Sequence, residues 1–426
     1  MVVGLQLQFR LIMLFYQLFV WLYYLSIRLL ALFNPKAKKW VEGRKGIFGR
    51  LQTEVSKSPD PIIWMHCASL GEFEQGRPVL EALRVKYPQK RILLTFFSPS
   101  GYEIRKNHPG VDMVFYMPMD FKSDAERFLD LVNPELAIFV KYESWMNYLI
   151  GLKSRNIPSL LISAIFTPEQ SFFGPLGKFL RSMLEKYSVI FVQQESSKQL
   201  LEKFNVKTDI RVSGDTRFDR VAHLPQLPLS HPVIEAFSIE AKVLVAGSTW
   251  HDDIKCLSKL QEDSSDLRMI IAPHEISETG IQKTTSMFSN ARLLSEATLE
   301  NIADSRVLII DTIGMLSKLY RFGRICYVGG GFNQAGIHNI LEAATYGKPI
   351  FFGPNHNRTA EAGELIALGA VVSFRETEDF VRDAKDLLND DLRLAKMGAI
   401  ASDYVQNKTG ATELILSYVG NLASLR

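Results

Sequence analysis

The sequence predicts an α/β protein in which two Rossmann-like domains of similar size follow an apolar N-terminal helix. From Pro61 onward, short apolar runs alternate with helical patterns, which is typical of parallel sheets covered on both faces. The alternation breaks in a proline-rich stretch around residues 222–233 and then restarts. These patterns divide the 426 residues into an anchor helix (1–34), a first domain (35–222), a linker (223–239), a second domain (240–400) and a C-terminal helical segment (401–426).

The bulk composition excludes several classes of function. With 47% hydrophobic and 22% charged residues, the chain is an ordinary globular protein, and a net charge of +3 is too small to indicate a nucleic-acid partner. The three cysteines lie far apart without C-x-x-C spacing, which favours a reducing compartment. There is no H-E-x-x-H, no D-x-D pair and no Cys/His cluster, so we expect no metal, and we expect no other cofactor.

The first predicted element is a membrane anchor. Residues 11–27 form an apolar run in which Gln17 and Ser26 are the polar members, and Asn34-Pro35 should end the helix. The run is at the lower limit of length for a membrane span, so spanning and lying in the interface both stay open. A buried core helix is the alternative. Because no small-residue cleavage site follows, we do not expect a cleaved signal peptide.

A basic stretch follows the anchor. Residues 36–50 contain six basic side chains and one acid, Glu42. Positive residues stay on the cytoplasmic side of a membrane, which predicts cytoplasmic domains on a single N-terminal anchor. Arg44, Lys45 and Arg50 would suit anionic headgroups or a phosphorylated lipid substrate. A solvated basic linker is an equally open interpretation.

Two carboxylates follow predicted strands of the first domain. Ser69, Gly71 and Glu72 come after the strand that begins at Ile62, and a helix is expected from about Gly76. A carboxylate at that place could serve as a general base, and a simple helix cap explains it equally well. Glu143 follows a later strand and could orient a polyhydroxyl substrate, with a helix-start carboxylate as the alternative.

In the second domain, polar residues again follow strands. Ser248 and Thr249 come after one strand and could donate to a phosphate. His274 comes after the next strand and could reach a phosphate or a base, although a role in capping a loop is equally open.

The strongest pattern is a glycine turn between a strand and a helix. Gly329, Gly330 and Gly331 follow the strand at 324–328, and a helix is expected from His338 to Tyr346. Such a turn points backbone N–H groups at an anion and lets the backbone approach a ligand closely. Glu342 would lie one helical turn after His338 and Asn339, where a carboxylate could accept ribose hydroxyls. The pattern favours a nucleotide site over a tight packing turn.

With these motifs in view, nearly the whole chain resembles 3-deoxy-D-manno-octulosonic acid (Kdo) transferases. The most specific matches are His66-x-x-Ser69-x-Gly71-Glu72, the 143–147 segment, and the glycine turn followed by Gly336-Ile-His338-Asn339 and Glu342. Weaker support comes from Met117-Pro-Met-Asp120, Gly214-Asp-Thr-Arg-Phe-Asp219 and Asp311-Thr-Ile-Gly314.

The resemblance implies a GT-B-type fold, two Rossmann-like domains facing a cleft, in an enzyme of the inner membrane. It implies inverting, metal-independent transfer of Kdo from a CMP-Kdo donor to a lipid A precursor, lipid IVA, in lipopolysaccharide biosynthesis. Glu72 would be the catalytic base, and His338, Asn339 and Glu342 fall in the segment that binds CMP. Another GT-B enzyme that uses a UDP-sugar, or a non-catalytic sugar-nucleotide binding protein, is the alternative.

The chain also departs from the family pattern. Many members have Pro-Arg-His where Pro273-His274 stands here, and many carry an arginine where Ile165 stands. Glu is common at the position of Met315, and Pro at that of Met146. The number of Kdo residues added, the acyl pattern of the acceptor and the oligomeric state are left open by the sequence.

Overall fold

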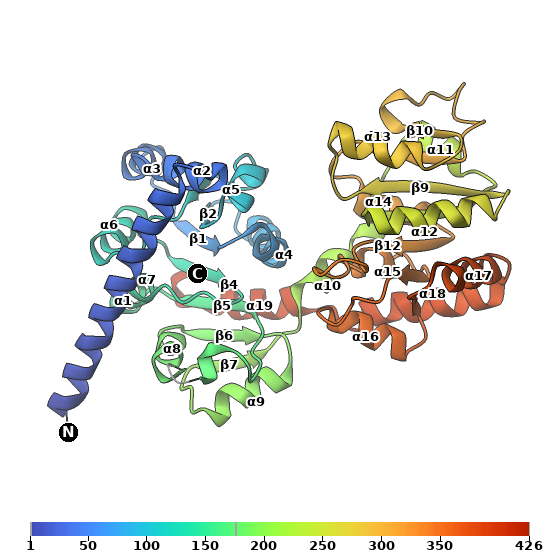
Figure 1. Cartoon of the computed structure of the whole chain (residues 1–426). Coiled ribbons are helices and arrows are strands. Elements are labelled where there is room, and N and C mark those ends of the chain that lie inside the picture. Colours follow the sequence, from blue (N-terminus) through green and yellow to red (C-terminus); the bar gives the residue numbers. More distant parts are fainter. Residues whose placement is uncertain (1, 175–176, 426) are drawn as a thin grey trace. The chain divides into compact units, whose positions relative to one another are not determined.

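A computed structural model describes residues 2–174 and 177–425, so Met1 and Arg426, which the predicted end segments include, lie outside the described residues. Contacts between residues divide the chain into two compact units, whose helices and strands are labelled in Figure 1. Unit 1 comprises Met1–Asp219 and Thr409–Arg426, and unit 2 comprises Arg220–Lys408. The segment 223–239, expected as a linker, contains a short 3-10 turn (Leu224–Gln226) and helix α11 (Pro232–Ser238), and both belong to unit 2.

Unit 1 is built on a seven-stranded parallel sheet with the order β3-β2-β1-β4-β5-β6-β7. Its strands are β1 (Ile62–Cys67), β2 (Arg91–Phe96), β3 (Met113–Tyr116), β4 (Leu136–Val140), β5 (Ser159–Ala164), β6 (Val189–Val192) and β7 (Asp209–Val212). The first six match the apolar runs of the sequence. Strand β7 was not predicted, because at the sheet edge Asp209 and Arg211 are exposed and only Ile210 is buried.

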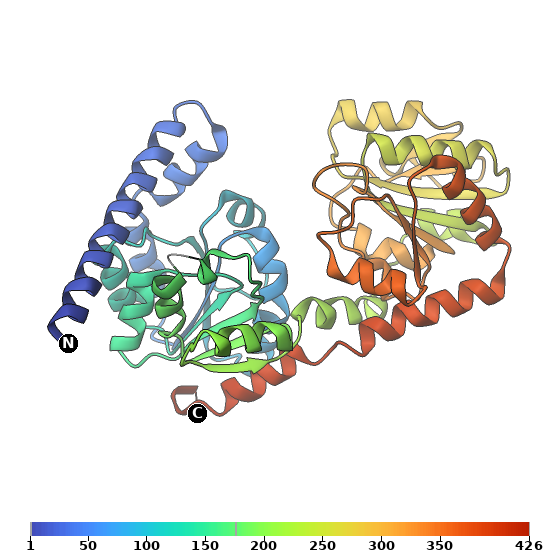
Figure 2. The same cartoon turned by 60° about the horizontal axis from the view of Figure 1, so that its bottom comes forward.

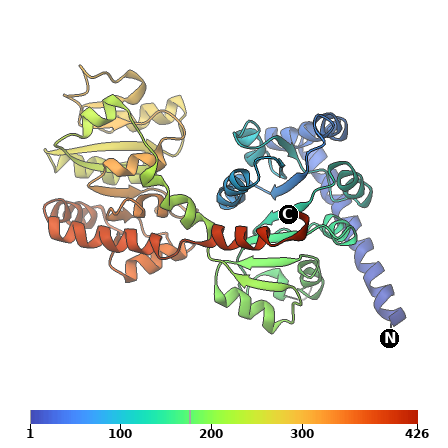
Figure 3. The same ribbon diagram turned by 180° about the vertical axis from the view of Figure 1, so that it is seen from behind.

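Helices cover both faces of this sheet. The helices of unit 1 after α1 are α2 (Pro35–Arg44), α3 (Ile47–Val55), α4 (Leu70–Lys86), α5 (Pro99–Arg105), α6 (Lys122–Val132), α7 (Met146–Ser154), α8 (Gly177–Leu184), α9 (Glu195–Lys203) and α19 (Ala411–Gly420). Helix α10 (Thr216–Ala222) contains the boundary between the two units. Alternate side chains of β1 face opposite cores: Trp64 packs with Phe128 of α6, and Met65 with Leu80 of α4. Helix α19, seen from behind in Figure 3, returns from the end of the chain and places Ile415 and Val419 in the α4 core.

Helix α1 (Val2–Leu30) runs along one side of unit 1 (Figure 2, dark blue). Tyr16 donates a hydrogen bond to the buried carboxylate of Asp120, and Gln17 Nε2 donates to Asn147 Oδ1 at 3.1 Å. Val20 is buried against Met119 and Trp40. The opposite face is exposed and apolar, with Leu14, Phe15, Leu18, Phe19, Leu22, Leu25 and Leu29 between 48% and 70% exposed. The window Ile12–Leu30 is the candidate membrane span among the described residues.

Unit 2 repeats the architecture with the order β10-β11-β9-β8-β12-β13-β14, again all parallel. The strands are β8 (Lys242–Thr249), β9 (Leu267–Pro273), β10 (Ala291–Leu293), β11 (Val307–Ile309), β12 (Ile325–Val328), β13 (Ile350–Phe352) and β14 (Val371–Ser373). Strand β10, which was not predicted either, has three residues, all half-buried. So short an edge strand leaves no periodic signal.

The remaining helices of unit 2 pack on both faces of this sheet. They are α12 (His251–Glu262), α13 (Glu278–Ser286), α14 (Leu316–Leu319), α15 (Leu341–Ala344), α16 (Ala360–Ala367), α17 (Thr377–Leu388) and α18 (Asp391–Gln406). Leu257 of α12 and Leu387 of α17 are fully buried in a core that includes Tyr327 of β12. Strands β8 and β12 pair side by side in this sheet, which places the loops that follow them at one edge of the sheet.

Candidate active site

In each sheet the strand order reverses at one place. Strand β1 lies between β2 and β4, and β8 lies between β9 and β12. Ligands of doubly wound sheets bind beyond the carboxyl ends of the strands at such a switch point. The predicted residues Ser69–Glu72 and Glu143 follow β1 and β4, while Ser248 and the glycine turn belong to β8 and the loop after β12. Both halves of the predicted site therefore lie at switch points of their own sheets.

Glu72 lies in the first turn of α4. The helix begins at Leu70, so the expected start near Gly76 is wrong: Ser69 and Glu72 form a capping box that starts the helix early, despite the glycines at 71 and 76. Oε2 of Glu72 accepts a hydrogen bond from the Ser69 backbone N–H at 2.8 Å. Gly71 is exposed beside it. Glu72 therefore caps α4, which is one of the two roles that the sequence left open. The cap also places its carboxylate at the switch point of the sheet.

The environment of Glu72 suits proton transfer near neutral pH. Burial, followed by the neighbouring charge of Glu143, raises the pKa of Glu72 to about 7, while the Ser69 hydrogen bond and Lys141 act in the opposite direction. Lys141 has a positive φ of 78°, a conformation that is costly for a lysine. A general base works best when its pKa lies near the working pH.

Glu143 is buried at the end of a chain of polar contacts. It accepts a hydrogen bond from the indole N–H of Trp145, and its Oε2 lies 3.5 Å from Nε2 of His66. Nδ1 of His66 lies 2.9 Å from the hydroxyl of Thr95, which accepts from Trp64 Nε1 at 2.8 Å. Thr95 was not singled out by sequence reasoning, because its register beside His66 comes from the pairing of β1 with β2.

The basic residues predicted for the acceptor differ in their surroundings. The guanidinium of Arg44 donates to the carbonyl oxygens of Met117, Trp40 and Phe97 at 2.9–3.2 Å, and burial lowers its pKa to about 9. Lys45 is exposed. Arg50 is also exposed and donates to the carbonyls of Lys45 and Gly43. Arg44 therefore serves the packing of α2, which makes it a weaker candidate than the other two.

The glycine turn of unit 2 is closed by backbone contacts. A Cβ on Gly329 would lie 2.3 Å from the Ser248 carbonyl oxygen, and one on Gly331 would lie 2.5 Å from the Gly353 nitrogen. Gly330 has a φ of 95°. Each position therefore requires glycine, so the turn is a tightly packed one as well as a candidate phosphate cradle.

Asp253 organises this turn and was missed by sequence reasoning. Its Oδ2 accepts from the backbone N–H groups of Trp250 at 2.8 Å and Gly330 at 2.9 Å, and its Oδ1 accepts from the Tyr327 hydroxyl at 2.8 Å. Burial raises its pKa, although these three hydrogen bonds oppose the shift. The signal in the sequence is an acidic residue three positions after Trp250, the residue before α12, which is the spacing of a capping box.

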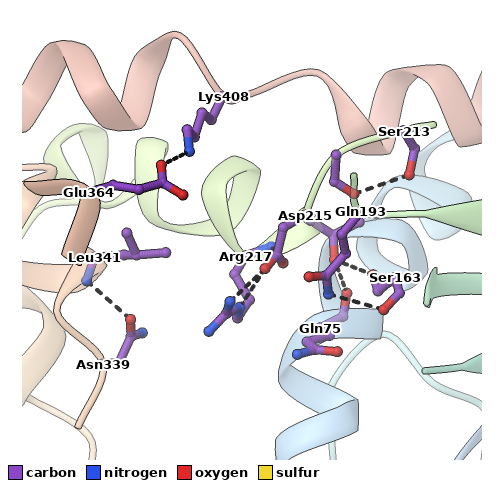
Figure 4. A network of polar contacts seen from close by, with 12 residues as sticks. Gln75, Ser163, Gln193, Ser213, Asp215, Arg217, Asn339, Leu341, Glu364 and Lys408 are labelled. Carbon is purple, nitrogen blue, oxygen red and sulfur yellow. Dashed lines mark hydrogen bonds and ion pairs between the residues drawn. The ribbon is translucent and has the colours of Figure 1, made fainter. Parts of the chain in front are cut away.

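The segment after the turn is less helical than expected. Helix α15 contains Leu341–Ala344, so the predicted helix from His338 to Tyr346 is wrong. So short a helix does not present a large dipole at its N-terminus. Asn339 Oδ1 accepts from the Leu341 backbone N–H at 3.1 Å (Figure 4), which uses the side chain to begin the helix. Glu342 lies 3.6 Å from Arg220. His338 and Asn339 thus precede the helix and do not share a helical face with Glu342.

Three aromatic rings meet beside the turn. Trp250 stacks on His274 with ring centroids 4.3 Å apart, and His274 packs on His338 at 4.6 Å. The indole N–H of Trp250 donates to His338 Nε2 at 3.2 Å. Ser248 has a φ of 54°, and the hydroxyl of the buried Thr249 has no partner among the described residues. Tertiary structure therefore joins His274 and His338, which the sequence had placed in separate loops.

The weaker motif at 214–219 has a structural explanation within unit 1. The hydroxyl of Thr216 donates to the Gln75 carbonyl and lies 2.8 Å from that of Ser163, while Gln193 Nε2 donates to the Ser163 carbonyl at 3.0 Å (Figure 4). Asp219 accepts from the backbone N–H groups of Gly410 and Thr412 and so holds the start of α19. Within the described ranges, no group of three His, Cys, Asp or Glu residues could hold a metal ion.

Similarity to known proteins covers most of the chain. Residues 42–220 match the family model described as 3-Deoxy-D-manno-octulosonic-acid transferase (kdotransferase). The chain is 26% identical to the 3-deoxy-D-manno-octulosonic acid transferase of Aquifex aeolicus, over 79% of this chain and 88% of the relative. It is 24% identical to the protein of the same name from Haemophilus influenzae, over 92% of this chain and 93% of the relative.

Solved structures share the fold at low sequence identity. UDP-GlcNAc 2-epimerase from Neisseria meningitidis aligns with a TM-score of 0.60 and 15% identity, covering 85% of this chain and all (100%) of that chain. MurG from Acinetobacter baumannii aligns with a TM-score of 0.52 and 12% identity, covering 85% and 100%. Together with the two seven-stranded parallel sheets, these likenesses confirm the predicted GT-B-type fold.

Proposed function

Since the chain belongs to the 3-deoxy-D-manno-octulosonic acid (Kdo) transferase family and is a glycosyltransferase, we propose that it transfers Kdo from CMP-Kdo to a lipid A precursor, lipid IVA, in lipopolysaccharide biosynthesis. The observation that carries the proposal is Glu72, a partly buried carboxylate with a pKa of about 7 at the switch point of unit 1. The transfer is inverting and needs no metal ion in this proposal.

In the proposed reaction, Glu72 takes the proton of a sugar hydroxyl on the acceptor. The oxygen then bonds to the anomeric carbon of Kdo, and the bond from that carbon to the phosphate oxygen breaks, so that CMP leaves from the opposite face. The transition state has oxocarbenium character, as in other glycosyl transfers. Glu143 tunes the base through its nearby charge and contacts the acceptor together with Ser69 and Gly71.

The donor half of the proposal uses the glycine turn. Because α15 is short, the support for the departing phosphate comes from the backbone N–H of Gly331 and from side chains beside it. The N–H of Gly330 is donated to Asp253, so Gly330 contributes by letting the backbone approach the ligand closely. The side chains proposed to contact the phosphate are Ser248, Thr249, His274, His338 and Asn339, while the carboxylate of Glu342 is proposed to accept the ribose hydroxyls. The buried hydroxyl of Thr249, which has no partner among the described residues, is consistent with a donor kept for a ligand.

The acceptor half of the proposal uses the membrane side of unit 1. The exposed apolar face of α1 would enter the lipid headgroup region of the inner membrane, and Lys45 and Arg50 would attract acceptor phosphates. Arg44 remains a weaker prediction for that role, since three carbonyls occupy its guanidinium. This arrangement would let cytoplasmic domains meet a lipid substrate.

The test is transfer from CMP-Kdo, generated in situ, to tetraacylated lipid A precursor in detergent, with the products counted by mass spectrometry. We expect Kdo addition that persists in EDTA and is lost in Glu72→Gln. Loss of activity in EDTA with recovery on adding a divalent cation would contradict metal independence. Turnover with a UDP-sugar but not with CMP-Kdo would identify a different GT-B enzyme, and binding of CMP without any turnover would indicate a binding protein.

A further inference from the structure

A tryptophan and a histidine from different loops of unit 2 form a direct side-chain hydrogen bond at the donor site. Trp250 follows β8 and His338 follows the glycine turn after β12, and their nitrogen atoms Nε1 and Nε2 are 3.2 Å apart. The Asp253 carboxylate accepts backbone N–H groups from Trp250 and from Gly330, which ties the two loops together. The pair is therefore held by the backbone as well as by its own contact.

The chemistry of the two rings determines where the proton of His338 lies. An indole nitrogen can only donate a hydrogen bond, so Nε2 of His338 must present a lone pair to it. A neutral imidazole carries one proton, and with Nε2 as the acceptor that proton belongs to Nδ1. Trp250 thus selects one of the two neutral tautomers of His338.

The Nδ1 edge of His338 is available to a ligand. The opposite edge of the ring faces the glycine turn, because its Cδ2 atom lies 3.1 Å from the position that a Cβ on Gly330 would take. The side chain is half-buried, and none of the described residues accepts a hydrogen bond from Nδ1. Nδ1 is not among the buried polar atoms that lack a partner, so this edge of the ring reaches solvent, where a bound molecule can accept its hydrogen bond.

The surroundings also keep His338 neutral. Burial and the neighbouring imidazole of His274 lower its pKa to about 4. The groups packed around His338 are the indole of Trp250, the ring of His274 and the backbone of the glycine turn. The nearby carboxylate of Asp253 accepts hydrogen bonds from backbone N–H groups and from the Tyr327 hydroxyl. No carboxylate forms an ion pair with His338 among the described residues.

We propose that Trp250 is a positioning residue that holds His338 in the Nδ1–H tautomer, as a neutral hydrogen-bond donor to the phosphate of the bound nucleotide. This inference rests on the proposed donor site in unit 2. A hydrogen-bond donor that is oriented before the nucleotide binds needs no reorganisation when the phosphate leaves. Because the ring stays uncharged, its contribution does not change with pH across the neutral range.

The first test reads the tautomer directly. In full-length protein with ¹⁵N-labelled histidine, we expect His338 to show the Nδ1–H pattern of ¹⁵N shifts from pH 6 to pH 8. Trp250→Phe keeps a ring beside His274 but lacks the N–H group. In that variant the Nε2–H tautomer should appear, and the Kd for CMP should increase about threefold because the competent tautomer is diluted. An unchanged tautomer in Trp250→Phe would overturn the proposal.

A matched pair of variants at His338 tests the same point without changing Trp250. The amide nitrogen of Asn can replace Nδ1, whereas that of Gln reaches the position of Nε2. We expect His338→Asn to bind CMP within about threefold of the original protein, and His338→Gln to bind about tenfold more weakly, the effect of one hydrogen bond to a charged acceptor. Equal affinities of the two variants would count against the proposal. This test does not depend on Trp250→Phe, so it still applies if that variant does not fold.

Failure of the proposed function can be told apart from failure of this inference. Binding is measured with CMP and with UMP by calorimetry, without any sugar or lipid. If UMP binds better than CMP, the assignment of the donor is wrong, while the tautomer of His338 and the ranking of the Asn and Gln variants still test the role of Trp250.

Discussion

The carboxylate of Glu72 accepts a hydrogen bond from the backbone N–H of Ser69 at 2.8 Å, so the proposed base also caps the helix that carries it. One oxygen atom is used for structure, and the carboxyl group as a whole titrates near neutral pH. A variant can therefore remove the base and keep the cap, because glutamine also closes a capping box.

Glu72→Gln and Glu72→Ala should separate these two roles. We expect Glu72→Gln to lower kcat by at least about a hundredfold, the usual contribution of a general base, with an unchanged unfolding temperature. Glu72→Ala should lose the same activity and also about 1 kcal/mol of stability, the cost of a lost cap. Transfer kinetics and thermal unfolding measure the two effects. Full activity of Glu72→Gln would exclude Glu72 as the base.

The pH dependence of transfer should report the pKa of Glu72. The base works when deprotonated, so kcat/KM should rise with pH and level off above about 7. Glu143 raises that pKa through its charge, and Glu143→Gln should therefore move the rising limb to lower pH. The midpoint of the profile is the measured quantity, because the variant can also change KM. A midpoint that does not move in Glu143→Gln would show that another group controls the rate.

Two glycines of unit 2 should respond oppositely to alanine. A Cβ on Gly331 would lie 2.5 Å from the Gly353 nitrogen, so Gly331→Ala should force the turn apart, weaken CMP binding and lower stability by about 1–3 kcal/mol. Gly363 lies in α16, and a Cβ at this position would meet nothing within 4 Å, so Gly363→Ala should stabilise the protein by up to about 1 kcal/mol. Chemical unfolding and CMP titration test both. A Gly331→Ala protein with normal stability and CMP affinity would contradict a closed turn.

The exposed face of α1 should control membrane binding without controlling folding. Leu18 and Leu22 are 55% and 56% exposed, and the double variant Leu18→Glu, Leu22→Glu should lose attachment to anionic vesicles, by about tenfold or more for each leucine. Leu392 of unit 2 is 86% exposed, and Leu392→Glu is the matched control that should still bind. Flotation of vesicles with the protein measures this difference. Continued binding of the double variant would point to a different membrane contact.

Asp120 should make stability depend on pH. Burial raises its pKa to about 7, so the folded protein holds a proton that the unfolded chain releases near its ordinary pKa of 3.8. A raised pKa gives stability at low pH that is lost as the pH rises from 3.8 through about 7, at about 1.4 kcal/mol for each pH unit in that window. Asp120→Asn should flatten this dependence between pH 4 and about 7, as measured by urea unfolding. An equally steep slope in the variant would assign it to other groups.

Much of the fold follows from local patterns. Fully buried parallel strands appear as apolar runs, and six of the seven strands of unit 1 were predicted in this way. The two missed strands, β7 and β10, are short or exposed edge strands whose residues lack that pattern. Helix limits were less well predicted: a capping box started α4 early, and Asn339 delayed the start of α15. In both cases one side chain outweighed the average preference of its neighbours.

The candidate residues were placed by the same logic, since polar groups after parallel strands must gather at one edge of a sheet. The sequence alone therefore determined the two Rossmann-like units, the apolar helix and the location of Glu72, Glu143 and the glycine turn beside switch points. Only the tertiary structure decided that Arg44 is held by carbonyl groups, that Asp253 joins two loops, and that Trp250 donates to His338, 88 residues away. Local periodicity records which face of an element is buried, whereas the partner of a side chain depends on the register of distant strands, and no local pattern carries that information.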